Sequence, residues 1–134
     1  ACKVNYRYAQ GIISGRYVSM EQRVYEISAY AKQSEEKALK TVIRSTDSTS
    51  LSVWVMKPGQ AVRDHVHHKG EDVWICLQGT GVFHPAEDEK VPVSAGKIVV
   101  TPKGVCHGMV NTGEEDFIFV SVCPQLSDYE ALPV

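Results

Sequence analysis

The sequence predicts one all-β domain, on the basis of its length, its short apolar runs and its turn residues. The chain has 134 residues, of which 43% are hydrophobic and 22% are charged, as in an ordinary globular protein. Two separate domains would each be too small to bury a good core. Short β-rich runs recur at intervals of about 8–12 residues and end at Gly, Pro or Asn, which is typical of a β-sandwich or β-barrel.

The N-terminal quarter differs from the rest, because residues 1–36 are more polar and less regular. Here residues 16–20 and 24–30 are strand candidates, and Ser34 followed by two acids favours the start of a short helix. We interpret residues 1–36 as an arm that packs on the barrel or on a partner subunit, and residues 37–134 as the barrel. The strands predicted in the barrel cover residues 37–44, 51–57, 73–77, 82–84, 91–93, 98–101, 105–110 and 117–122.

Charge and cysteine usage restrict the partners and the compartment. The net charge of −2 argues against a nucleic acid or an anionic membrane held by bulk charge. No apolar run approaches the ~20 residues of a membrane span, and no secretory leader pattern is visible. The four cysteines form no CxxC pair, which favours buried thiols in a reducing compartment. We therefore expect a cytoplasmic protein that binds neither nucleic acid nor membrane.

The histidines cluster in the sequence. Three of the five lie in the segment Asp64-His65-Val66-His67-His68. On a strand, His65 and His67 point to the same face, about 6–7 Å apart, where they can clamp one metal ion. A lone His-x-His pair is a weak signal, and a solvated pair of histidines is its ordinary interpretation. The residues around it strengthen the metal hypothesis.

Two ordered motifs surround these histidines. The first consists of Gly59, five residues, His65-x-His67, four residues, Asp72, six residues and Gly79. The second consists of Gly96, five residues, Pro102-x-Gly104, two residues, His107, three residues and Asn111. Together they resemble the two signature motifs of the cupin superfamily over residues 59–111. The flanking strands extend the resemblance to roughly residues 37–123.

The resemblance implies a jelly-roll β-barrel of six to eight antiparallel strands with one divalent metal ion inside. The metal ligands of that family fall here on His65, His67, a carboxylate and His107. In a small barrel, inward positions of adjacent strands converge on one interior point, so this set is physically reasonable. Nitrogen and oxygen ligands of this kind suit Fe, Mn, Ni, Co, Cu or Zn, and the ligand set does not distinguish them.

The identity of the carboxylate stays open at this point. The family usually has Glu where this chain has Asp72, and a glutamate, Glu71, stands one residue earlier. Counting back from Gly79 favours Asp72, whereas counting forward from His67 allows either residue. Because strand side chains alternate, Asp72 would place Trp74, Cys76 and Gln78 inward, and Glu71 would place Val73, Ile75 and Leu77 inward. A site of three histidines and a water is a third alternative.

Three further residues are candidates for binding a substrate. Arg63 precedes His65 by two residues, so alternation predicts the same face, nearer the barrel mouth, where its fork suits a substrate carboxylate. A salt bridge with a nearby acid is the ordinary alternative for Arg63. Trp74 and Met109 share the faces of the predicted ligands, and core packing is their alternative role. His68 and His84 are expected in solvent.

A function follows only in outline, because one fold and one kind of site serve many reactions. We expect a small metal-binding cupin that is an enzyme acting on a small oxygenated metabolite, of the keto- or hydroxy-acid type. Dioxygenase, isomerase and lyase chemistry all suit a metal with two open positions. The alternative is a non-catalytic module that binds or senses a sugar or another small ligand. We also expect a homodimer, because apolar barrel strands such as 117–120 need cover.

Overall fold

The computed structural model describes residues 12–13, 16–17, 22–86, 88–124 and 129–132, and nearly all of its regular structure is β. The elements run in the order β1 Ile12–Ile13, β2 Arg16–Tyr17, the 3-10 helix η2 Ile27–Ala29, β3 Leu39–Ser45, β4 Ser50–Met56, β5 Ala61–Val66, β6 Asp72–Gln78, β7 Thr80–His84, β8 Val91–Ser94, β9 Ile98–Thr101, β10 His107–Asn111, β11 Phe117–Cys123 and β12 Glu130–Ala131. No helix among these residues is long and apolar enough to cross a membrane.

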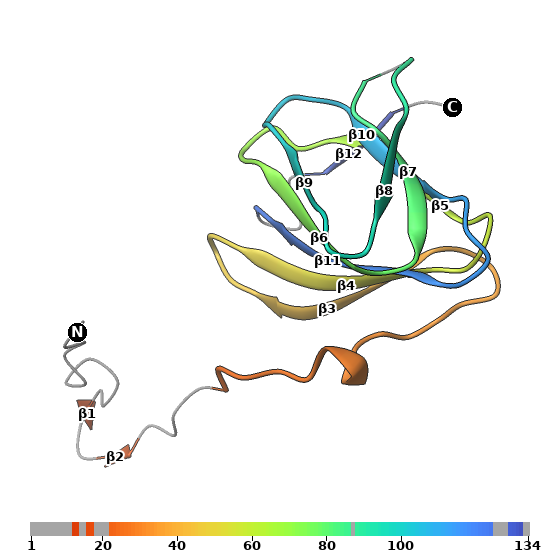
Figure 1. Cartoon of the computed structure of the whole chain (residues 1–134). Coiled ribbons are helices and arrows are strands. Elements are labelled where there is room, and N and C mark those ends of the chain that lie inside the picture. Colours follow the sequence, from red (N-terminus) through yellow and green to blue (C-terminus); the bar gives the residue numbers. More distant parts are fainter. Residues whose placement is uncertain (1–11, 14–15, 18–21, 87, 125–128, 133–134) are drawn as a thin grey trace, which may run out of the picture.

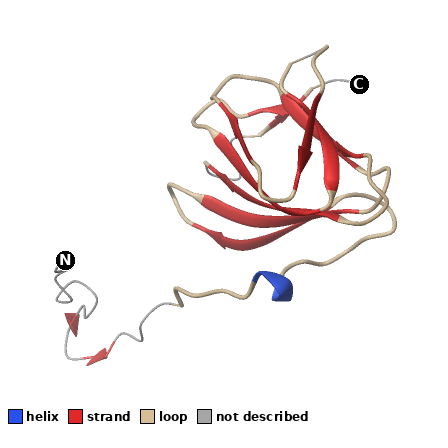
Figure 2. Ribbon diagram, viewed as in Figure 1, coloured by secondary structure: helices blue, strands red, loops and turns tan. Residues whose placement is uncertain are grey.

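Two five-stranded antiparallel sheets form the body of the molecule (Figures 1 and 2). One has the order β12-β5-β10-β7-β8 and the other the order β3-β4-β11-β6-β9. Successive strands often change sheet, so residues far apart in the chain lie side by side, as in a jelly roll. The all-β jelly-roll prediction is confirmed. The sheets contain ten strands instead of six to eight, and the sequence pattern gave no sign of β12.

The core lies between the two sheets and follows from side-chain alternation. On β6, Trp74 and Cys76 face the core, and on β11 Phe117 and Phe119 do so. Met109 of β10 is fully buried among them. These apolar side chains from both sheets pack on one another, which explains why the two sheets close.

The outer face of the second sheet is also apolar. Val53, Val55 and Val120 form a second cluster there, and Tyr30 and Ala31 pack against it. These two residues belong to the predicted arm. The boundary of the arm at residue 36 stays a prediction.

The segment before β3 differs from the sequence prediction. Residues 24–30 form no strand: Val24 is 81% exposed, and Ile27–Ala29 form η2. Local hydrogen bonds, such as the one that the Tyr25 hydroxyl donates to the Gln22 carbonyl, replace strand pairing. The expected helix after Ser34 is a bend instead. Of residues 16–20, only Arg16–Tyr17 lie within the described residues, where they pair with β1.

A positive backbone φ at Gly79 explains one fixed glycine of the motifs. This residue joins β6 to β7 with φ of +85°, a conformation that side-chain-bearing residues rarely adopt. A Cβ at this position would lie 2.7 Å from the carbonyl oxygen of Asp116. The turn therefore requires glycine both for its conformation and for its close approach to the neighbouring backbone.

Candidate metal centre

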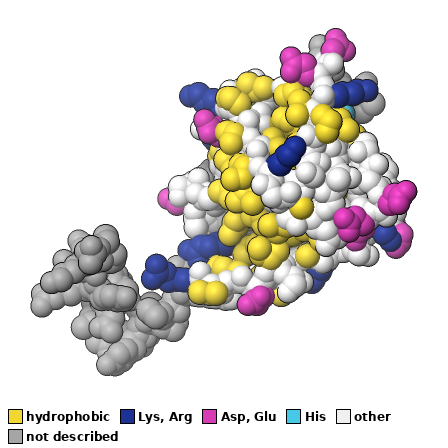
Figure 3. Space-filling view, in the orientation of Figure 1, with side chains coloured by type: hydrophobic (Ala, Val, Ile, Leu, Met, Phe, Trp, Pro, Cys, Tyr) yellow, Lys and Arg dark blue, Asp and Glu magenta, His cyan; other side chains and the backbone are white. Residues whose placement is uncertain are grey.

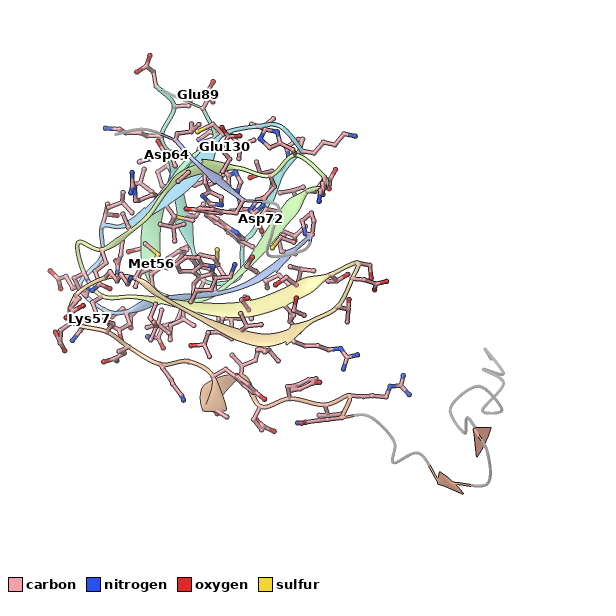
Figure 4. All side chains as sticks on the ribbon, turned by 180° about the vertical axis from the view of Figure 1, so that it is seen from behind. Met56, Lys57, Asp64, Asp72, Glu89 and Glu130 are labelled. Carbon is pink, nitrogen blue, oxygen red and sulfur yellow. The ribbon has the colours of Figure 1, made fainter. Side chains whose placement is uncertain are left out.

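Four buried side chains converge between the two sheets. His65, His67, Asp72 and His107 each offer one ligand atom, and these atoms all lie within 4.8 Å of one another. Asp72 Oδ2 lies 3.1 Å from His107 Nε2, 3.3 Å from His67 Nε2 and 3.8 Å from His65 Nε2. All four residues are at most 5% exposed. Figure 4 shows Asp72 reaching into the interior of the molecule.

The strand arrangement brings these residues together from both sheets. His65 of β5 and His107 of β10 are direct partners across an antiparallel pair. His67 follows β5 directly, and its carbonyl accepts a hydrogen bond from the Gly104 amide at 2.7 Å. Asp72 begins β6 in the opposite sheet. The turn at Gly104 in the second motif thus fixes the backbone at His67 in the first motif.

Backbone carbonyls orient two of the imidazoles. His65 Nδ1 lies 2.7 Å from the carbonyl oxygen of Arg63, and His107 Nδ1 lies 3.1 Å from that of Val105. A ring whose Nδ1–H donates to a carbonyl leaves Nε2 to bind a metal ion, or to carry a proton that it donates to Asp72 when no ion is bound. Both Nε2 atoms face Asp72, so these histidines are preorganised for a cation.

The Asp72 carboxylate is held from two sides. Its Oδ1 accepts a hydrogen bond of 3.0 Å from the hydroxyl of Ser121, while Oδ2 faces the histidines. Burial by itself disfavours a charged carboxyl, but hydrogen bonds from His107, His65 and His67 outweigh it and hold the pKa of Asp72 well below its usual range. The site therefore carries a buried anion that faces three nitrogen ligands.

The spacing of these atoms fits one metal ion. Two ligand atoms at right angles around an ion, each about 2.1 Å from it, are about 3.0 Å apart. The distances of 3.1 and 3.3 Å match this value, and the 3.8 Å of His65 needs only a small movement. Imidazole and carboxylate are the ligand types of divalent transition metals. The donor set and its geometry therefore fit the ion that the sequence predicts.

The structure places Asp72, and not Glu71, at the centre. Asp72 is 3% exposed, whereas Glu71 is exposed to solvent. Trp74 and Cys76 point inward as that alternative requires. Gln78 does not, because the β6–β11 register shifts between Cys76 and Gln78, and Gln78 is exposed. The prediction that Trp74, Cys76 and Gln78 all point inward is therefore wrong for Gln78.

The face predicted for Arg63 is also wrong. The β5–β10 register pairs His65 with His107 but Val62 with Met109, so β5 carries one extra residue between them. This bulge turns Val62 inward and leaves Arg63 exposed. The Arg63 guanidinium instead donates to the Leu132 carbonyl at 3.5 Å. Arg63 therefore does not share the face of His65, and we do not assign it to the site.

Trp74 and Met109 lie beneath the histidines. The Trp74 ring centroid is 5.2 Å from that of His107 and 6.3 Å from that of His65, and the residue is 1% exposed. Met109 is fully buried in the same cluster. Trp74 therefore forms a floor under the site and Met109 belongs to the core cluster around it, and contact with a substrate stays a prediction for both.

The two remaining histidines lie away from the centre. His68 is exposed and pairs with Glu130 at 2.7 Å, in agreement with its expected position. His84 is only partly exposed, and its Nδ1 lies 3.5 Å from Asp64 Oδ1. His84 is therefore less solvated than expected, because its ring lies next to the Asp64 carboxylate.

Ser121 and Tyr129 contact the centre but were missed by sequence reasoning. Ser121 continues the inward alternation of Phe117 and Phe119 on β11, so a polar residue at an inward position was the available signal. Tyr129 lies against His65 and His67. No sequence pattern marked it, because its place depends on the pairing of β12 with β5.

Comparison with known proteins agrees with this fold and site. The model of the Cupin domain family matches residues 52–123, which contain all four converging side chains. The chain therefore belongs to the cupin family. A solved structure from Klebsiella pneumoniae, described as an uncharacterized conserved protein with a double-stranded beta-helix domain, is 30% identical with a TM-score of 0.79. The match covers 85% of this chain and 100% of that one.

Two curated relatives illustrate the range of functions. An oxalate-binding protein of Thermotoga maritima is 36% identical over 67 residues, which cover 50% of this chain and 54% of that protein. A glucose-6-phosphate isomerase of Pyrococcus horikoshii is 31% identical over 113 residues, which cover 75% of this chain and 54% of that protein. The chain thus spans about half the length of these relatives.

Proposed function

We propose that the protein holds one divalent metal ion with His65, His67, Asp72 and His107, and that it is an enzyme acting on a small keto- or hydroxy-acid bound at this ion. The convergence of three imidazoles and one carboxylate, all buried, is the observation that supports the proposal. Four protein ligands on an octahedral ion leave two positions for a chelating molecule. When bound, the ion would supply a Lewis acid able to polarise a carbonyl or hydroxyl oxygen of that molecule.

The chain's own residues prepare this chemistry. Carbonyls 63 and 105 fix the His65 and His107 rings, and the Ser121 hydroxyl fixes the Asp72 carboxylate. Trp74, with Phe83 and Phe119 beside it, packs the floor with aromatic surface and excludes water from below. A dry, rigid setting of this kind strengthens electrostatic interactions with a bound anion.

Turnover tests the enzymatic proposal. Metal-loaded protein would be incubated with a panel of hydroxy- and keto-acids while oxygen uptake and products are measured. We expect turnover of at least one acid, lost in the His107→Ala variant and kept in the matched surface variant His68→Ala. Turnover that persists in the His107→Ala variant would contradict a role for this site.

A non-catalytic binding module is the second candidate, and the oxalate-binding relative favours it. The two proposals make different predictions for the same samples. Binding of oxalate or another acid without any product after prolonged incubation supports the module. Product formation supports the enzyme.

We also propose that the protein is a cytoplasmic homodimer. On the outer face of the second sheet, Ile75, Leu77, Ile98 and Val100 are between 37% and 64% exposed. Figure 3 shows hydrophobic side chains gathered on this side of the molecule. A second copy of the chain would cover them. Light scattering is expected to give twice the chain mass, and a monomer mass at micromolar concentration contradicts this.

The cytoplasmic location rests on cysteine chemistry. The buried Cys76, which forms no disulfide bond, supports a reducing compartment.

A further inference from the structure

The C-terminal strand lies along the strand that carries His65. Glu130 and Ala131 of β12 pair with Val66 and His65 of β5, and the Leu132 amide donates to the Asp64 carbonyl at 3.2 Å. β12 is the edge strand of this sheet and lies next to β5, with β10 on the far side of β5. This pairing fixes the backbone next to Tyr129. The position of Tyr129 is therefore set by the same strand that presents the metal ligands.

The Tyr129 ring lies directly against two of the candidate ligands. Its centroid is 4.9 Å from that of His65, with an angle of 30° between the rings, and 6.1 Å from that of His67. Both histidines are at most 5% exposed, whereas Tyr129 is 48% exposed. Tyr129 thus stands at the boundary between the buried centre and solvent.

Trp74 and Tyr129 enclose His65 at different depths. Both rings are within about 30° of parallel to the His65 ring, but Trp74 is 1% exposed. Trp74 is therefore enclosed by core side chains and has almost no surface that another molecule could contact. The tyrosine has about half its surface exposed, while its ring contacts two of the candidate metal ligands.

We propose that Tyr129 forms the outer wall of the metal site and contacts the small anion bound there. This inference rests on the proposed function, because it requires an anion at the metal. The edge of an aromatic ring carries a partial positive charge, and the phenol hydroxyl is a hydrogen-bond donor. Both features suit the oxygens of a carboxylate. Because the ring lies directly against His65, an acid bound at the metal would lie beside the ring and meet its edge and hydroxyl, so Tyr129 would help select small anions.

Anion affinity of the Co²⁺-loaded protein tests this role, with oxalate as the probe and the visible Co²⁺ spectrum as the signal. Tyr129→Leu removes the ring, and Tyr129→Phe keeps the ring without the hydroxyl. Glu130→Gln is the matched control, because it alters the neighbouring exposed residue, whose pair with His68 is solvated, and leaves the Tyr129 side chain intact. Co²⁺ affinity and melting temperature are measured for every variant.

We expect Tyr129→Leu to bind oxalate about tenfold more weakly than the parent while it retains Co²⁺ affinity. Tyr129→Phe should restore most of the oxalate affinity, and Glu130→Gln should match the parent. Unchanged oxalate affinity in Tyr129→Leu would contradict the proposal that Tyr129 contacts the anion. Equal losses of Co²⁺ and oxalate affinity would also overturn it, since Tyr129 would then only support the histidines.

The parent protein separates this inference from the proposed function. If the parent binds no Co²⁺, the metal-dependent function is contradicted, and the proposed role of Tyr129 is contradicted with it. If the parent binds Co²⁺ and oxalate but the Tyr129 variants do the same, only the wall fails.

Discussion

The molecule contains histidine–carboxylate groups at two depths, and they differ in every respect that matters for binding. At the centre, Asp72 meets three histidine nitrogens, and none of these side chains is more than 6% exposed. At the surface, His68 meets Glu130 at 2.7 Å, with side chains 57% and 63% exposed. The surface contact is the shorter one. Burial, number of ligands and supporting hydrogen bonds, rather than contact distance, therefore distinguish a candidate metal centre from an ordinary ion pair.

Of the changes considered, removal of the central carboxylate should have the largest effect, and the effect should be on metal affinity. We expect Asp72→Ala to lower metal affinity by at least about 100-fold, because three histidines lose the only carboxylate that faces them among the described residues. Glu71→Ala, at the neighbouring exposed position, should leave metal affinity unchanged. Titration with a metal indicator measures both variants. The reverse ranking would mean that β6 has a different register from the one described.

Loss of the hydroxyl behind the carboxylate should have a smaller effect. Ser121→Ala removes the hydrogen bond to Asp72 Oδ1, and loss of such a supporting contact typically lowers metal affinity by about tenfold. Ser52→Ala is a matched control, since Ser52 pairs with Ser121 across β4 and β11 and its buried hydroxyl has no hydrogen-bond partner among the described residues. Equal metal affinity in both variants would show that Ser121 does not support the site.

The surface pair should contribute least. Glu130→Gln is expected to change the free energy of unfolding by no more than about 1 kcal/mol, because an exposed ion pair is well solvated. Chemical denaturation measures this change, which should shrink further at high salt. A loss of several kcal/mol would show that the surface pair resembles the central group more than its exposure indicates.

Sequence reasoning identified the centre because its residues stand at fixed distances from turn glycines. Gly59, Gly79, Gly96 and Gly104 all have positive φ, as residues that end strands at tight turns require. The spacing from Gly79 favoured Asp72 over Glu71, and Asp72 is the one of the two that lies among the three buried histidines. The all-β fold was equally readable, because its strands are short, apolar and clearly separated.

The errors arose where strict alternation fails or where distant segments meet. Bulges in β5 and β6 moved Arg63 and Gln78 to other faces, and a single extra residue leaves no clear mark in a hydrophobic pattern. Tyr129 reaches the centre through the pairing of β12 with β5, and Ser121 through the pairing of β11 with β6. Contacts of this kind depend on tertiary register, which local sequence does not encode.

Metal content tests the central claim most directly. The untagged parent, His107→Ala and His68→Ala would be purified side by side and subjected to elemental analysis for divalent transition metals. The account predicts close to one ion per chain in the parent and in His68→Ala, and a sharp loss in His107→Ala. Equal loss in His68→Ala, or full metal content in His107→Ala, would contradict the assignment of the buried histidines and Asp72 as the metal centre.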